Sequence, residues 1–281
     1  MRFSLIVATI NRTTELHDLL TSLTRQTYRE FEVIVVDQNA DDRLVPILKF
    51  FGDRLQILRL KSPSGLSRAR NAGLRAARGD VICFPDDDCR YSENVLEAVK
   101  QHFAANPKLD GVVGDSIDET GQRILPLPSR KGRVTRTKWW RLALSITIFL
   151  KREMIEAIGT FDETLGLGAG SPWGCGEDIE YVLRALRAGF RFTYDPEILV
   201  FHPKVFLELD KAGLTKRYSY AKGQGKLCQK HPMPLWWIAV FFSISGVRAI
   251  LAAVTFNFQK SQAEWLIFKG RLEGLLSSRN A

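Results

Sequence analysis

The stretch "FSLIVATINRTTELHDLLTSLTRQTYREFEVIVVD", residues 3–37, indicates the fold most clearly. It begins and ends with continuous apolar runs, at 3–9 and 31–37, that are rich in β-branched residues. Runs of this kind favour strands that are covered on both faces of a sheet. Between them, the leucines of 16–23 recur at helical spacing. The stretch therefore predicts a strand, a helix and a second strand in succession.

The same alternation continues to residue 105. Apolar runs at 55–60 and 80–86 predict two further strands, and 41–51 and 64–79 have helical patterns. Strands that alternate with helices predict an α/β fold with a doubly wound, mostly parallel sheet flanked by helices. In such sheets ligands bind outside the carboxyl ends of the strands.

Three carboxylates follow the strand predicted at 80–86. Asp86, Asp87 and Asp88 stand side by side, and unpaired like charges repel and are costly to bury. A divalent cation, Mg²⁺ or Mn²⁺, would resolve the repulsion, and such ions usually bind substrate phosphates as well. The alternative is a solvated turn that caps a helix beginning near Ser92.

Further polar residues fall at the same predicted edge. Thr9, Asn11 and Arg12 end the first strand, and Asp37 ends the second. Farther along, Glu177 and Asp178 open a predicted helix after the glycine-rich stretch 161–178. A carboxylate there is placed to act as general base toward a hydroxyl. The alternative is a helix-terminal charge, worth at most about 1 kcal/mol.

Composition narrows the class of protein. The chain has 281 residues, a net charge of +9 and a pI near 9.5, which favours an anionic partner. The positive charge is scattered and accompanies no nucleic-acid-binding module, so we expect no nucleic acid. Four cysteines without a CxxC pair predict free thiols in a reducing compartment.

Two stretches of the second half have irregular patterns. Residues 121–141 are basic and punctuated by Pro and Gly, which predicts a long loop. Its Trp139 and Trp140 either touch a membrane surface or pack inward. Residues 190–203 predict two short strands flanking Pro196.

The C-terminal region carries an apolar segment of membrane-spanning length at 235–256, interrupted by Arg248. Three interpretations stay open: a helix in the membrane interface, a spanning helix, and a helix in a soluble core. Trp236, Trp237 and Trp265, with nearby lysines, suit the interface.

Six motifs carry a resemblance to a known family. They are "SLIVATINR", "VIVVDQN", "GLSRARNAGLRAARGD", "FPDDD", "GCGEDIEYVLRALRAG" and "PEILVFHP". In this order, over residues 1 to 205, the chain resembles a family 2 glycosyltransferase with the GT-A fold. The resemblance implies a nucleotide-sugar-binding and catalytic domain at 1–205. The apolar segment beyond it predicts a C-terminal helical extension at 206–281 that interacts with a membrane.

The resemblance implies a nucleotide site at the strand ends. Asp37 would recognise the base, Thr9 and Asn11 would line the pocket with Arg70 nearby, and Asp86 would face the ribose and diphosphate. The competing interpretations are a turn residue for Asp37 and a helix-surface charge for Arg70. The resemblance favours UDP. Relatives often carry a second acid after Asp37, where this chain has Gln38, and this departure leaves GDP and dTDP open as well.

The resemblance also implies the catalytic groups. Asp88 would hold the metal, Mn²⁺ or Mg²⁺, and His202 would complete its shell unless it is a structural histidine. Asp178 would be the base of an inverting displacement, and Glu177 would position donor or acceptor. Trp173 would either stack on the acceptor or anchor its loop.

The implied function is transfer of one sugar from a UDP-sugar to a hydroxyl of a glycan or lipid-linked acceptor. We expect it to serve cell-surface polysaccharide or glycolipid synthesis at the cytoplasmic face of the membrane, with the membrane surface as a partner.

Three other functions compete with this expectation. A catalytically inactive nucleotide-sugar-binding scaffold would tolerate loss of the acids, which are present. A sugar-phosphate nucleotidylyltransferase or a Rossmann oxidoreductase would need a glycine-rich turn after the first strand, where this chain has "TINRTTE".

Overall fold

The computed structural model describes residues 1–125, 129–142, 144–203 and 208–278. The chain forms two compact units. The first comprises Met1–Ser64, Arg68–Phe161 and Tyr181–Lys204, and the second comprises Gly65–Ser67, Asp162–Glu180 and Val205–Ala281. Residues 126–128 of the predicted loop and 204–207 at the predicted domain boundary lie outside the described residues.

The first unit is built on one mixed sheet. Its strands, among the described residues, are β1 (Phe3–Thr9), β2 (Phe31–Asp37), β3 (Ile57–Lys61), β4 (Val81–Cys83), β5 (Arg90–Tyr91), β6 (Gly111–Ile117), β7 (Gly132–Arg133), β8 (Ile148–Lys151) and β9 (Phe192–Phe201). They lie in the order β3-β2-β1-β4-β8-β6-β9-β5, with β7 paired to β9. The pairings of β1 with β2 and β4, of β2 with β3 and of β6 with β9 are parallel, and the others are antiparallel. The α/β fold is confirmed.

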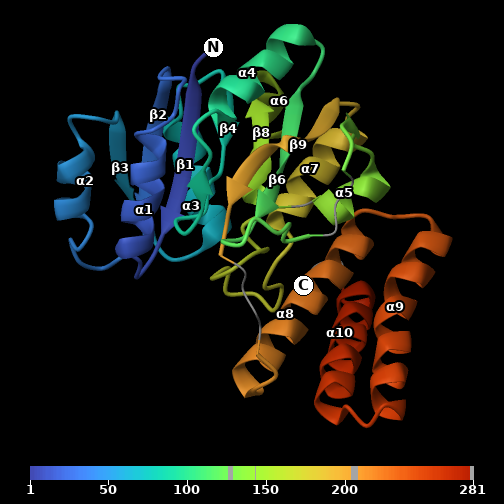
Figure 1. Cartoon of the computed structure of the whole chain (residues 1–281). Coiled ribbons are helices and arrows are strands. Elements are labelled where there is room, and N and C mark those ends of the chain that lie inside the picture. Colours follow the sequence, from blue (N-terminus) through green and yellow to red (C-terminus); the bar gives the residue numbers. More distant parts are fainter. Residues whose placement is uncertain (126–128, 143, 204–207, 279–281) are drawn as a thin grey trace. The chain divides into compact units, whose positions relative to one another are not determined.

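Helices cover both faces of this sheet (Figure 1). They are α1 (Thr14–Leu23), α2 (Val45–Phe51), α3 (Leu66–Ala76), α4 (Val95–Ala105), α5 (Arg136–Leu142), α6 (Arg152–Ile158) and α7 (Glu177–Arg187), with a short 3₁₀ turn at Ser145–Thr147. On one face, the leucines of α1 and the apolar side of α4 share a core with alternate residues of β1 and β2. On the other, Phe161 packs between Phe84 and Tyr181 of α7, with ring centroids 5.0 and 4.2 Å away.

Two predictions about irregular stretches need correction. Residues 121–141 are not one long loop, because they contain β7 and all but the last residue of α5, and Trp139 of α5 is fully buried. Residues 190–203 form one strand, β9, rather than two. Its register with β6 shifts between the pairs Val113–Tyr194 and Asp115–Leu199, and Pro196 lies in that shift. The missing N–H of proline is tolerated there, because no ladder bond to β6 is due.

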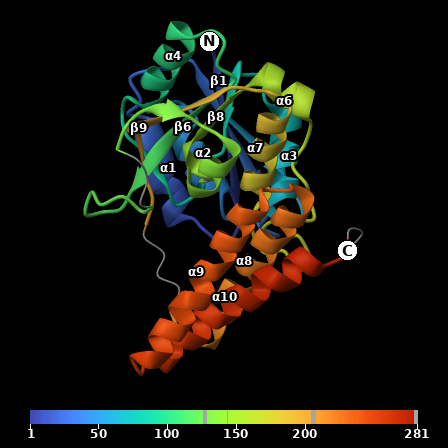
Figure 2. The same cartoon turned by 90° about the vertical axis from the view of Figure 1, so that its right-hand side faces the viewer.

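The second unit is built on three long helices. These are α8 (Lys211–Lys230), α9 (Leu235–Val254) and α10 (Phe258–Leu276), which run side by side in both views (Figures 1 and 2). The guanidinium of Arg271 on α10 joins them. It donates to Gln224 Oε1 of α8 at 2.9 Å, and to Phe241 O and Ser245 Oγ of α9 at 2.7 and 2.9 Å.

Candidate functional site

The sheet brings the predicted residues of the first unit to one edge. β1 and β2 run parallel and end in Thr9 and Asp37, whose Cα atoms are partners in the register. β4 is parallel to β1, so the aspartates after it reach the same edge. β9 runs in the same direction and is followed by His202. The expected ligand edge of the sheet therefore carries these groups from four strands.

Asp86, Asp88 and His202 form a cluster suited to a cation. Each offers one ligand atom, and these atoms all lie within 4.8 Å of one another. Asp88 Oδ1 is buried and accepts no hydrogen bond from the described residues, although it lies 3.3 Å from His202 Nε2. A buried carboxylate oxygen without a donor is unfavourable unless something binds it. Two carboxylates and an imidazole fit Mn²⁺ better than Mg²⁺, which prefers an all-oxygen shell.

The histidine of this cluster has the orientation expected of a ligand. His202 Nδ1 lies 2.7 Å from the Pro203 carbonyl, to which it can only donate, so the lone pair of the neutral ring falls on Nε2. Burial lowers the pKa of His202, but the Asp88 carboxylate outweighs it and the pKa lies above its ordinary value. Burial likewise opposes the charge of Asp88, yet His202 and Arg12 lower its pKa to about 2.

Arg12 is a member of the site whose role the sequence did not reveal. Its Nη1 lies 2.8 Å from Asp87 Oδ1 and also forms an ion pair with Asp88 Oδ2. Part of the expected repulsion in the aspartate run is therefore relieved within the protein. Burial still raises the pKa of Asp87 to about 6, despite the opposing charge of Arg12. The position of Arg12 just after the first strand was the only available signal.

Arg70 is buried rather than a helix-surface charge. Its Nη2 lies 3.3 Å from Asp86 Oδ1 and donates to Ser145 Oγ at 2.8 Å. Its guanidinium carbon lies 5.8 and 5.7 Å from the ring centroids of Phe84 and Phe161. The two aromatic rings and the hydroxyl hold the guanidinium in place, and they therefore fix the direction from which it approaches Asp86.

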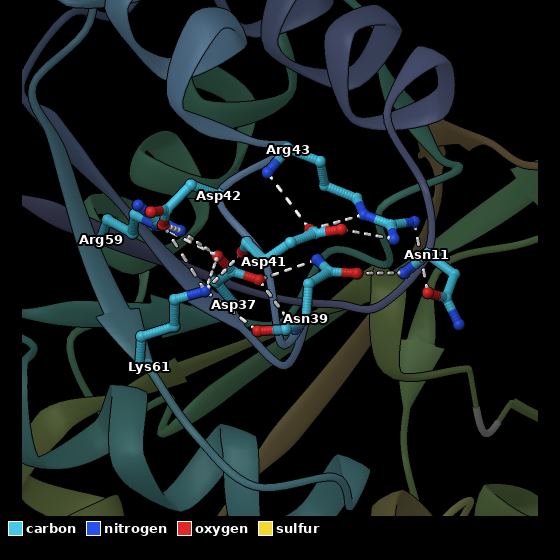
Figure 3. Close-up of polar contacts among 8 residues, drawn as sticks. All are labelled: Asn11, Asp37, Asn39, Asp41, Asp42, Arg43, Arg59 and Lys61. Atoms are coloured by element: carbon cyan, nitrogen blue, oxygen red, sulfur yellow. Dashed lines mark hydrogen bonds and ion pairs between the residues drawn. The ribbon is translucent and has the colours of Figure 1, made fainter.

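Asp37 is the centre of a second polar network, shown in Figure 3. Its Oδ1 accepts hydrogen bonds from the backbone and side-chain nitrogens of Asn39, at 2.9 and 2.7 Å. Its Oδ2 accepts from Arg59 Nη2 at 2.6 Å and lies 3.0 Å from Lys61 Nζ. Burial opposes the charge of Asp37, but these donors outweigh it and hold its pKa below the ordinary value. Asp37 is therefore more than a turn residue.

Asn39 connects this network to the end of β1. Its Oδ1 accepts from the backbone N–H of Asn11 at 2.7 Å (Figure 3). Asn11 has a φ of 58°, a left-handed conformation that asparagine tolerates better than most residues. Asn11 and Asp37 were predicted from the sequence, but Asn39, Arg59 and Lys61 were not. The pattern of β3 does not show which of its residues face the ligand edge, and Asn39 follows β2 without a motif of its own.

Glu177 and Asp178 lie in the second unit, at the start of α7. Glu177 is buried and Asp178 is half-buried, with the Ile179 N–H donating to Asp178 Oδ1 at 2.7 Å. Gly176, immediately before them, has a φ of 103°, and a Cβ there would come within 2.6 Å of Leu227 Cδ1 on α8. On the next residues of α7, Glu180 lies 3.2 Å from His231. The first turn of α7 is thus fixed against α8.

Trp173 is buried in this structure. Lys226 Nζ lies 5.2 Å from the centroid of the Trp173 ring. The Trp173 carbonyl accepts a hydrogen bond from the Gly166 N–H at 3.0 Å. These contacts favour the loop-anchoring interpretation of Trp173. Its role in binding an acceptor stays a prediction.

Comparison with known proteins identifies the family. The sequence model of Glycosyl transferase family 2 matches residues 4–158, more than half of the chain. The chain belongs to glycosyl transferase family 2. It is 26% identical over 233 residues to Glycosyltransferase AglE of Haloferax volcanii, covering 79% of this chain and 72% of that relative.

Solved structures show the same fold. The Staphylococcus aureus TarS 1-349 structure in complex with UDP-GlcNAc has a TM-score of 0.62 at 17% identity, covering 96% of this chain and 92% of that one. The mannosyltransferase PcManGT from Pyrobaculum calidifontis, in complex with GDP-Man and Mn²⁺, has a TM-score of 0.64 at 15% identity, covering 98% and 87%. The expected GT-A fold of this family 2 glycosyltransferase is confirmed, and glycosyl transfer is its class of reaction.

Proposed function

We propose that this family 2 glycosyltransferase moves one sugar from a nucleoside diphosphate sugar, a UDP-sugar by preference, to an acceptor hydroxyl with inversion at the anomeric carbon. The observation that carries the proposal is the cluster of Asp86, Asp88 and His202 at the ligand edge of the sheet. Within it, the buried Asp88 Oδ1 accepts no hydrogen bond from the described residues. The similar folds of proteins solved with UDP-GlcNAc and with GDP-Man and Mn²⁺ support it.

Asp86, Asp88 and His202 would hold the divalent cation, Mn²⁺ by preference. Bound there, it would supply a Lewis acid that offsets negative charge on the diphosphate. The chain's own residues complete the electrostatics: Arg70 orients Asp86, and Arg12 neutralises Asp87. With Asp86 and Asp87 each paired to an arginine, and Arg12 and His202 beside Asp88, the run no longer presents three unopposed charges.

The base end of the donor would meet the Asp37 network. Asp37 already accepts from Asn39, Arg59 and Lys61, while a carboxylate offers about four lone-pair positions. A base that binds Asp37 must therefore replace one of these donors. Lys61 is the candidate, because its side chain is the most exposed of the three in contact with Asp37 and its Nζ has carbonyl partners at Asn39 and Asp41.

Asp178 would act as the base. The acceptor oxygen attacks the anomeric carbon, the bond from that carbon to the diphosphate oxygen breaks, and the acceptor proton passes to the Asp178 carboxylate. The nucleoside diphosphate leaves with the bonding electrons, so no covalent enzyme intermediate is needed. We propose a glycan or lipid-linked acceptor, in cell-surface polysaccharide or glycolipid synthesis.

The test replaces Asp178 by Asn and follows nucleotide release from a panel of UDP-sugars with Mn²⁺. Loss of a general base is expected to lower transfer by about 10²–10⁴-fold while UDP binding is unchanged. Glu153→Gln is the matched control, because it removes an exposed acid from the first turn of another helix, α6. Transfer by Asp178→Asn at the control's rate would refute the assignment, and transfer by neither wild type nor control with any acceptor would favour the scaffold.

A further inference from the structure

Helix α9 has an apolar face that the described residues of its unit leave exposed. It is the one helix, within the described ranges, that is long and apolar enough to cross a membrane. Its most apolar 18 residues have a mean hydropathy of 2.0, and only 22% of them are buried. Phe242, Ser245, Ala249 and Ala252 form its buried side. The exposed apolar side chains recur at helical spacing on the opposite side: Trp236, Val240, Ile244, Val247, Ile250, Leu251 and Val254. An uncovered face of this size marks an interaction surface.

The turn between α9 and α10 extends this surface. Phe256 and Phe258 are 81% and 67% exposed, and their rings meet edge to face at 6.3 Å. Phe256 has a φ of 56°, where glycine or asparagine is the usual residue after a helix. A bulky residue in this conformation is strained, and strain of this kind is retained where function requires it. The strained turn holds an aromatic pair out in solvent.

The positive charge of the C-terminal region indicates what kind of partner covers this surface. Residues 205–281 contain eleven Lys and Arg against four Asp and Glu, which accounts for +7 of the chain's +9. Two copies meeting through this segment would bring like charges together, whereas an anionic lipid surface would attract it. Trp236 and Trp265 are both more than half exposed, and tryptophan suits the depth of lipid headgroups.

Arg248 decides how the helix lies. It is exposed on α9, beside Val247 and one turn from Ile244 and Leu251. In a spanning helix this arginine would face lipid near the middle of the bilayer, where it is strongly disfavoured. In a helix that lies in the plane, its charge reaches the headgroups.

We propose that α9 and the Phe256–Phe258 turn bind the surface of an anionic phospholipid bilayer, with α9 lying in the interface. The apolar face of α9 and the two phenylalanines enter the boundary between headgroups and acyl chains. Exposed cationic side chains of this region, such as Lys211, Lys216 and Lys260, meet the anionic headgroups. This surface is independent of the sugar-transfer chemistry, so its test needs no substrate.

The first experiment is co-sedimentation of the full chain with vesicles. Wild type is expected to bind vesicles that contain phosphatidylglycerol, to bind pure phosphatidylcholine more weakly, and to lose part of the binding in high salt. Phe256→Ser/Phe258→Ser should weaken binding by on the order of ten-fold or more. Phe50→Ser is the matched control, because Phe50 is 60% exposed but lies on α2.

The second measurement reports depth through tryptophan fluorescence. Lipids brominated near the headgroup should quench more strongly than lipids brominated near the chain end. Trp236→Phe/Trp265→Phe should remove most of that quenching.

Three results would overturn the binding of a bilayer, and a fourth would overturn the in-plane arrangement of α9. One is a failure of wild type to bind anionic vesicles, and another is equal binding by the double variant and wild type. The third is a dimer in light scattering that Phe256→Ser/Phe258→Ser disperses without any vesicle binding, because a second copy would then cover the face. Deepest quenching at the chain end would overturn the in-plane arrangement.

Discussion

Asp86, Asp87 and Asp88 follow one another in sequence, yet each has a different neighbour in the fold. Asp86 lies beside Arg70, Asp87 beside Arg12, and Asp88 between His202 and Arg12. The pKa values that the structure favours diverge accordingly, to about 6 for Asp87 and about 2 for Asp88. The sequence predicted that the run of aspartates needs a positive charge beside it. That Arg12 supplies part of this charge could not be predicted, because the contact depends on how β1 and β4 pair in three dimensions.

Asp37→Asn should lower the free energy of unfolding by about 1–3 kcal/mol at neutral pH, because Arg59 and Lys61 lose a buried carboxylate partner while staying partly solvated. The folded pKa of Asp37 is lowered, so its contribution is present above the ordinary value of 3.8 and is lost as the pH falls below it.

The measurement is chemical unfolding of both proteins across the acidic range. The stability difference between Asp37→Asn and wild type should shrink as the pH falls below 3.8. A difference that stays constant down to the acid limit, or that grows, would contradict the ion-pair network of Figure 3.

At the scale of elements, the glycine-rich stretch 161–178 matters because it places the start of α7. The sequence predicted the helix and its two leading acids but not what holds them. Gly176 needs both a left-handed φ and the absence of a Cβ, since Leu227 of α8 fills that space. Contacts of this kind join residues far apart in sequence, so no local pattern predicts them.

Gly176→Ala tests this placement. The variant should lose about 1–3 kcal/mol of stability and most of its transfer activity, because backbone strain and the Leu227 contact displace the first turn of α7. Gly170→Ala is the control within the same stretch: its φ is 74°, but nothing lies within 4 Å of a Cβ there. It should show a stability loss of about 1 kcal/mol with transfer largely retained. Activity and melting temperature are measured on both variants. Backbone strain alone should lower only the melting temperature, whereas displacement of the first turn of α7 should also lower transfer.

Equal loss of transfer in the two glycine variants would contradict this account. It would mean that the conformation of the whole stretch, rather than the contact between Gly176 and α8, controls the reaction. Unchanged transfer in Gly176→Ala would show that the start of α7 is not needed in this position.

At the scale of the whole molecule, periodicity was sufficient for the fold. Continuous apolar runs and helical spacing indicated β1, β2 and the helix between them, and six ordered motifs indicated the family that the comparisons then showed. Irregular stretches were less predictable. Pro196 suggested two strands, but a register shift between β6 and β9 lets one strand continue through it. The helix α5 was not predicted, because the residues around it are basic and rich in Pro. The domain boundary at 205/206 stays a prediction.

Asp86, Asp88 and His202 are proposed to bind a nucleotide through a divalent cation. Isothermal titration of UDP, GDP and dTDP, each with and without Mn²⁺, tests it most directly on wild type, Asp88→Asn and the control Asp18→Asn, an exposed acid of α1. The account predicts that Mn²⁺ tightens UDP binding to wild type and Asp18→Asn by at least about ten-fold, and that Asp88→Asn loses this gain. Equal binding of UDP by wild type with and without Mn²⁺, or an undiminished Mn²⁺ effect in Asp88→Asn, would contradict it.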